Sequence, residues 1–264
     1  MRRVAVLLAT MTLATMTLAV VLASEAAQAI INGQPDANRH PYVGMVYSDE
    51  GRCSGTLISP TVVLTAAHCT QAWLTEGTSE EELPVYVTFE QNADRDPDDA
   101  YVGTPVTHPD YDGFFPDVGV VILEDPVQEV TIYGKLPEAN LVAGLEKGTS
   151  LTAVGYGVQD FEVGSGPPRP TGELTRYKAT VRYLGTNGVD NGFGRHRFIK
   201  TKEGSAGQGG EGTCFGDSGG PYFLGDQRTI VAVTSFGLNP VCAGVGYAQR
   251  VDLPVVRNWV RSFL

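Results

Sequence analysis

Glycine and proline interrupt this sequence so often that few stretches are long enough to form a helix. The 264 residues include 32 glycines and 16 prolines, and apolar residues make up 42% of the chain. Such a composition can bury a sizeable core, and its frequent turn residues favour many short strands. The length allows one large all-β domain or two half-domains. A helical bundle and a collagen-like fibre are excluded, and we expect a two-barrel or sandwich β protein.

Short β-branched and aromatic runs support this expectation. Side chains alternate between apolar and polar along Tyr177–Leu184, as in a half-buried strand. The predicted strands are Thr56–Ile58, Val62–Thr65, Val85–Phe89, Val118–Leu123, Leu151–Tyr156, Tyr177–Leu184, Thr229–Phe236 and Tyr247–Val251. Only the C-terminus, opened by Pro254, has the apolar spacing of a helix. Residues 160–172 and 203–212 are rich in glycine or proline and are predicted to be loops.

The first 29 residues have the pattern of a secretory signal. Arg2 and Arg3 precede the apolar run Val4–Ala23, and Ala27-Gln28-Ala29 matches the small-x-small site of signal peptidase. An uncleaved membrane anchor is the alternative, because about twenty apolar residues just span a bilayer. We expect cleavage after Ala29, secretion to the extracellular space and no membrane association of the mature chain.

The four cysteines are expected to form disulfides in an oxidising compartment. Cys53, Cys69, Cys214 and Cys242 allow three pairings, and the residues alone do not choose among them. A zinc site is the alternative, but no two of these cysteines lie two to four residues apart, as such motifs usually require.

The formal net charge of −11 excludes nucleic acid as the expected partner, because binding phosphates requires a basic face. Acidic residues gather in the segment Asp94–Asp99. Alternating carboxylates there suit calcium, but a solvated loop is the preferred interpretation. We expect no other cofactor and no metal in the site described next.

Three segments carry side chains that suit nucleophilic catalysis. Gly216–Pro221 reads GDSGGP and places Ser218 among glycines, whose backbone N–H groups could receive a developing oxyanion. A serine hydroxyl also needs a base, and Thr65–Cys69 offers His68 after a predicted strand. Asp117 opens the buried-looking run Asp117–Leu123. Each segment alone has a structural explanation, but together they supply histidine, aspartate and serine in that order.

In these three segments and their order the sequence resembles the chymotrypsin/trypsin-like serine proteases over residues 30–264. The resemblance implies two antiparallel Greek-key β-barrels with a C-terminal helix. The halves would span roughly residues 30–145 and 146–264. It also implies the disulfides Cys53–Cys69 and Cys214–Cys242.

The resemblance further implies a role for each residue of the three segments. His68 would be the general base and Ser218 the nucleophile that forms the acyl-enzyme, while Asp117 would orient the imidazole. The backbone N–H groups of Gly216 and Ser218 would form the oxyanion hole. Asp112 is a rival for the acid, but it lacks a strand after it, and Asp117 is preferred.

The N-terminus that cleavage after Ala29 would create is Ile30-Ile31-Asn32-Gly33, which is similar to the activated terminus of that family. The resemblance implies an ion pair between the α-ammonium of Ile30 and the carboxylate of Asp217. Because almost no propeptide separates the signal from Ile30, we expect signal peptidase itself to create the active terminus.

The sequence identifies only some of the residues that would form the specificity pocket. Gly212 stands where trypsins of this family carry an acid, and Gly244 competes with Gly246 for one wall position. The residues expected to form the pocket are Gly212, Thr213, Ser235, Phe236, Gly237 and Gly246. Without an acid at the base, we expect cleavage after Phe, Tyr or Leu. Elastase-like and trypsin-like specificities are alternatives, the latter if an acid such as Asp226 reaches in from elsewhere.

These features predict a secreted, monomeric serine endopeptidase that acts on polypeptides and can be bound by protein protease inhibitors. The alternative from another class is a protease-fold binding protein that has lost activity. Such proteins usually lack a member of the catalytic set, whereas His68, Asp117 and Ser218 are all present.

Overall fold

Six short strands of the first half close into an antiparallel barrel. The computed structural model describes residues 30–49, 51–73, 84–162, 169–187, 196–204, 210–225 and 228–264, so the predicted signal segment and Asp226 lie outside the described residues. The barrel order is β2 (Val43–Ser48), β3 (Gly51–Ser59), β4 (Val62–Thr65), β7 (Gly119–Leu123), β6 (Tyr101–Thr107) and β5 (Val85–Thr88). Its interior belongs to the largest apolar cluster among the described residues, which is rich in valine and extends into the second half of the chain.

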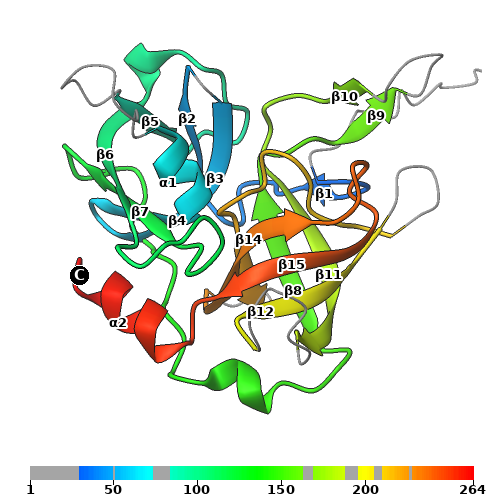
Figure 1. Ribbon diagram of the computed structural model, residues 1–264. Coiled ribbons are helices and arrows are strands. Elements are labelled where there is room, and N and C mark those ends of the chain that lie inside the picture. Colours follow the sequence, from blue (N-terminus) through cyan, green and yellow to red (C-terminus); the bar gives the residue numbers. More distant parts are fainter. Residues whose placement is uncertain are drawn as a thin grey trace, which may run out of the picture.

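The second half forms a similar barrel beside the first (Figure 1). Its strand order is β8 (Ser150–Gly155), β11 (Tyr177–Thr186), β12 (Phe198–Glu203), β15 (Gly244–Arg250), β14 (Ile230–Gly237) and β13 (Pro221–Leu224), and β13 pairs with β8 to close it. The predicted alternation along β11 is confirmed, because Tyr177, Ala179, Val181 and Tyr183 are buried. The short β1 (Gln34–Pro35) pairs with the start of β11.

Helices are few among the described residues. The predicted C-terminal helix is confirmed as α2 (Pro254–Arg261), and its buried Val256 and Val260 pack into the apolar cluster of the first barrel (Figure 1). The expectation of a helix only at the C-terminus is wrong, because Ala67–Trp73 forms α1. With seven residues, α1 is too short to show a clear apolar period. No described helix has the length and apolar character needed to cross a membrane.

The predicted loop at 160–172 also contains regular structure. Strands β9 (Asp160–Glu162) and β10 (Arg169–Thr171) pair with each other in a separate hairpin. Phe161 is buried there, whereas its neighbours are exposed. Short 3-10 turns occur at Pro97–Asp99 and Leu141–Gly144.

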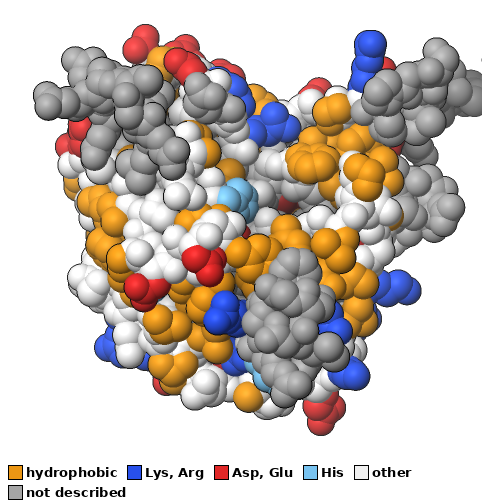
Figure 2. All heavy atoms as spheres, viewed as in Figure 1, with side chains coloured by type: hydrophobic (Ala, Val, Ile, Leu, Met, Phe, Trp, Pro, Cys, Tyr) orange, Lys and Arg blue, Asp and Glu red, His pale blue; other side chains and the backbone are white. Residues whose placement is uncertain are grey.

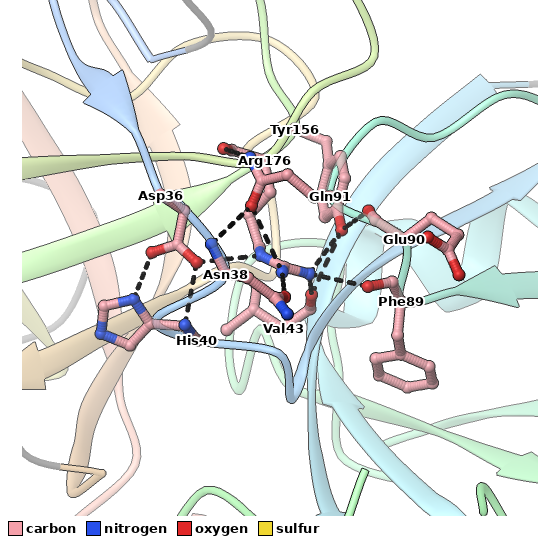
Figure 3. A network of polar contacts seen from close by, with 9 residues as sticks. All are labelled: Asp36, Asn38, His40, Val43, Phe89, Glu90, Gln91, Tyr156 and Arg176. Carbon is pink, nitrogen blue, oxygen red and sulfur yellow. Dashed lines mark hydrogen bonds and ion pairs between the residues drawn. The ribbon is translucent and has the colours of Figure 1, made fainter. Parts of the chain in front are cut away.

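Arg176 joins the two barrels at their interface (Figure 3). The side chain is fully buried, and its Nε donates to Asp36 at 3.1 Å. One terminal nitrogen donates to the carbonyl oxygens of Val43 and Phe89, both at 2.9 Å. The buried His40 also contacts Asp36, with 2.5 Å between Nδ1 and Oδ1. The polar groups of this interface are therefore paired with one another.

Candidate active site

The loop that carries Ser218 lies between β12 and β13 and is tied to the first barrel. Ser54 of β3 donates its backbone N–H to the carbonyl of Ser218 at 2.8 Å and its hydroxyl to the carbonyl of Gly216 at 2.9 Å. Gly219 has a φ of +76°, and a Cβ there would come within 2.0 Å of the hydroxyl of Thr65. Glycine is thus required next to the serine for the loop to approach the first barrel this closely.

His68 and Asp117 form a hydrogen-bonded pair at the edge of the first barrel. His68 lies on α1 directly after β4, and its Nδ1 is 2.9 Å from Oδ2 of Asp117. The backbone N–H of His68 donates to the other carboxylate oxygen at 2.9 Å. Although burial lowers the pKa of His68, the hydrogen bond and charge of Asp117 outweigh it, and the pKa is raised.

Two side chains of the second barrel hold Asp117, and the sequence analysis did not assign them this role. The hydroxyl of Ser235 on β14 donates to Oδ2 of Asp117 at 2.5 Å. Oε1 of Gln249 on β15 accepts from the backbone N–H of Asp117 at 3.1 Å. The rival Asp112 instead accepts from the backbone N–H groups of Phe114 and Phe115. The preference for Asp117 as the partner of His68 therefore agrees with the geometry.

His68 and Ser218 line the same cavity of about 670 Å³. Figure 2 shows the corresponding hollow between the two halves of the molecule, with a histidine side chain in its wall and hydrophobic side chains along its rim. The expected pocket residues that line this cavity are Thr213, Ser235, Phe236, Gly237 and Gly246. Gly212 and Gly244 are not part of the lining.

An acid that the sequence analysis missed also lines this cavity. Glu203 ends β12, is buried, and accepts hydrogen bonds from the hydroxyl of Thr201 and the backbone N–H of Thr213, both at 2.5 Å. Burial raises its pKa, although these hydrogen bonds oppose the shift. The expectation that the pocket lacks an acid is therefore wrong. The acid comes from a neighbouring strand, at a position predicted to begin a loop.

Asp217, which precedes Ser218, is completely buried. It accepts from the backbone N–H groups of Cys214 and Gly157, both at 2.8 Å. Burial raises the pKa of Asp217 to about 7 despite these bonds. Ile30 is also buried, but the described contacts include no ion pair between it and Asp217. The predicted pair stays a prediction.

The structure contains the disulfides Cys53–Cys69 and Cys214–Cys242, which is the pairing that the resemblance implied. Among the described residues, one group of potential metal ligands lies close together, and it consists of Cys53, His68 and Cys69. Its two cysteines form a disulfide, so they are not available as thiolate ligands. The carboxylates of Asp94–Asp99 do not form such a group in the described part of the chain, so calcium there gains no support.

Comparisons with known proteins agree with this geometry. The family model described as Trypsin matches residues 30–260. "Trypsin" of Saccharopolyspora erythraea is 31% identical over 215 residues, which are 78% of this chain and 86% of that protein. "Glucanase inhibitor protein 3" of Phytophthora sojae is 30% identical over 224 residues, or 83% of this chain and 79% of that protein.

Among solved structures, "HL collagenase" aligns with a TM-score of 0.66 and 19% identity, covering 89% of this chain and 98% of that chain. This likeness concerns the fold, with its two six-stranded barrels and C-terminal helix. Because the family model spans almost all of the described residues, the assignment does not depend on one motif. The chain belongs to the trypsin-like family of serine proteases.

Proposed function

We propose that this protein is an active serine endopeptidase that uses Ser218, His68 and Asp117. The observation that carries the proposal is His68, hydrogen-bonded to Asp117, in the wall of the cavity that Ser218 also lines. The Ser218 oxygen attacks the peptide carbonyl while His68 Nε2 takes its proton. The C–N bond then breaks as His68 gives this proton to the leaving amine. Water then attacks the acyl carbonyl while His68 takes its proton, and the C–O bond to Ser218 breaks as His68 gives this proton to the Ser218 oxygen.

The backbone around Ser218 supports a role in holding the oxyanion. The N–H groups of Asp217, Gly219 and Gly220 all donate to backbone carbonyls. In the described part of the chain, the N–H groups of Gly216 and Ser218 donate no such bond. Both residues line the cavity, so these two donors are available to a tetrahedral intermediate.

Activation by cleavage after Ala29 is the second part of the proposal. Asp217 is a buried carboxylate without an ion-pair partner among the described residues. Such a charge is strongly destabilising unless a cation joins it. The α-ammonium of Ile30 would supply that cation and hold the loop that contains Gly216. Secretion follows from the same signal segment, and the two disulfides fit an oxidising compartment.

A protein that retains Ala29 tests this step. Losing a buried ion pair costs about 3 kcal/mol or more, so kcat/KM should fall by roughly 100-fold relative to a chain that begins at Ile30. Both forms would be prepared by cleaving a fusion protein, with their N-termini read by sequencing. Equal activity of the two forms would exclude the Ile30–Asp217 pair as an activation device.

The similarity to a glucanase inhibitor protein favours one second candidate, a binding protein without hydrolytic activity. The two functions are separated by hydrolysis of peptide anilides that differ only in the residue before the scissile bond. The chain beginning at Ile30 and its Ser218→Ala variant would be compared. Turnover that the variant loses supports the protease. No turnover of any substrate, together with no reaction of Ser218 with a small organophosphorus fluoridate, would favour the binding protein.

A further inference from the structure

Glu203 lies where the pocket glycines leave room for it. A Cβ added at Gly212 would come within 2.4 Å of Oε2 of Glu203, and one added at Gly246 within 2.3 Å of Oε1. The carboxylate therefore occupies the space that side chains at these two positions would need. Because Gly246 and Glu203 both line the cavity of His68 and Ser218, this carboxylate belongs to the substrate cavity.

The surroundings of Glu203 provide hydrogen-bond donors but no cation. The donors are the hydroxyl groups of Thr201 and Tyr222, at 2.5 and 3.2 Å from Oε1, the backbone N–H of Thr213 at Oε2, and the hydroxyl of Thr213. None of the ion pairs among the described residues involves Glu203. Glu203 is 6% exposed, and a buried acid of this kind is strongly stabilised by a cation that enters from the cavity.

We propose that Glu203 is the specificity-determining residue of this protease and that its carboxylate selects a cationic side chain, lysine above arginine, before the scissile bond. This inference rests on the proposed peptidase function. It replaces the sequence-based preference for Phe, Tyr or Leu, which assumed that the pocket has no acid. The negative charge of the pocket belongs to Glu203 at the end of β12, and position 212 is a glycine.

The walls of the cavity suit the aliphatic part of a lysine side chain. Phe236, Val245 and the disulfide-bonded Cys214 and Cys242 line it. A lysine side chain has four methylene groups that can pack on these apolar walls while its ammonium group reaches a polar end. Thr213 and Glu203 supply polar atoms in the same cavity.

The hydrogen bonds already made by Glu203 favour lysine over arginine. A carboxylate oxygen has about two acceptor positions. Thr201 and Tyr222 use both positions on Oε1, and Thr213 uses one on Oε2. Because the hydroxyl of Thr213 is also a hydrogen-bonding partner of Glu203, little acceptor capacity remains on this carboxylate. A guanidinium fork binds best when it reaches both oxygens, whereas an ammonium group needs only a single acceptor from this carboxylate.

The experiment compares peptide anilides with Lys, Arg, norleucine or Phe before the scissile bond. Norleucine is the matched control, because it keeps the four side-chain carbons of lysine and lacks the charged ammonium group. We expect kcat/KM for Lys to exceed that for norleucine by roughly 100-fold or more. Glu203→Gln should reduce this ratio to less than about tenfold. Glu138→Gln, which removes a highly exposed acid paired with Arg257, should leave the ratio unchanged.

A second variant tests the choice between lysine and arginine. Tyr222→Phe frees one acceptor position on Oε1, so the Arg-to-Lys ratio of kcat/KM should rise several-fold while cleavage of both substrates continues. Titration of Ser218 with the organophosphorus fluoridate gives the fraction of intact sites in each preparation. The wild-type comparison of Lys with norleucine requires no variant to fold.

Each outcome bears on the role of Glu203. If kcat/KM for norleucine or Phe equals that for Lys, the role of Glu203 is overturned. The role is also overturned if the Glu203→Gln variant keeps the wild-type ratio of kcat/KM between Lys and norleucine. Arginine preferred by the wild type overturns the selection of lysine. If nothing is hydrolysed, calorimetric binding of acetylated peptides ending in Lys or norleucine to the Ser218→Ala variant still tests the pocket. Stronger binding of the Lys peptide would support the role of Glu203 even though the peptidase proposal had failed.

Discussion

The carboxylate of Asp117 controls which nitrogen of His68 carries the proton. An ionised carboxylate only accepts hydrogen bonds, so the His68 Nδ1 that faces it at 2.9 Å is the protonated nitrogen. Nε2 is then left unprotonated, as its proposed role as the base requires. Ser235 donates to the same carboxylate from the opposite barrel, and Asp117 is buried. The orientation of the base therefore depends on a side chain that lies outside the three motifs.

Replacing Ser235 with alanine should lower kcat/KM by about tenfold, because a buried carboxylate loses one donor at a cost of about 1 to 1.5 kcal/mol. The variant and wild type would be compared by steady-state kinetics on one anilide substrate. Ser262→Ala is the control, since that hydroxyl donates to a backbone carbonyl on α2, away from the cavity. A Ser235→Ala enzyme with wild-type kcat/KM would show that the hydroxyl does not position Asp117.

The raised pKa of His68 predicts the acidic limb of the activity profile. The base must be neutral to accept the Ser218 proton, so kcat/KM should fall as the pH drops through a value above 6.5. The negative charge of Asp117 favours the protonated form of His68, so the acidic limb lies at a higher pH than it would for an unperturbed histidine. The check is a kcat/KM profile from pH 4 to 9 in buffers of constant ionic strength. Activity that stays flat down to pH 4 would exclude His68 as the base.

Helix α1 carries His68 but depends on its neighbours for its position. A helix of seven residues is not stable alone in water. A disulfide joins Cys69 to Cys53 of β3, and the hydroxyl of Thr70 lies 2.8 Å from that of Thr107 on β6. Gly119 at the start of β7 leaves room for Thr70, since a Cβ there would lie 2.5 Å from this hydroxyl.

Gly119→Ala should therefore displace α1 and lower the free energy of unfolding by about 1 to 3 kcal/mol, with a parallel loss of kcat/KM. Thr70→Ala removes the two side-chain atoms that the new Cβ would contact most closely. Urea denaturation of both single variants and the double variant forms a double-mutant cycle. The double variant should recover part of the loss. Strictly additive effects would show that the two positions do not interact.

The proposed active site is complete only when both barrels are in contact. His68 and Asp117 belong to the first barrel, whereas Ser218 and Glu203 belong to the second. Arg176 stabilises this contact from a fully buried position (Figure 3). Although burial alone would raise the pKa of Asp36, hydrogen bonds from His40 and the charges of His40 and Arg176 lower it. This ionic network replaces apolar packing over part of the barrel interface.

Arg176→Met should lower the free energy of unfolding by about 3 to 5 kcal/mol, because it leaves Asp36 with less compensation in a buried site. Urea denaturation measures the loss, with Arg261→Met on an exposed part of α2 as the control. The contribution of Asp36 is present above pH 3.8 and is lost as the pH falls through its lower folded pKa. The variant should lose less stability over that acid range. An unchanged unfolding free energy would contradict the bridging role.

The sequence by itself determined the strands with strong alternation, the terminal helix and the order of the histidine, aspartate and serine proposed to be catalytic. Such features depend on neighbours a few residues apart, where side-chain periodicity and turn residues carry the information. Only the tertiary structure decided the location of α1 and the presence of Glu203 at the pocket glycines 212 and 246. These depend on closure of the barrels, which brings together segments distant in the sequence, and no local pattern records which side chains then meet.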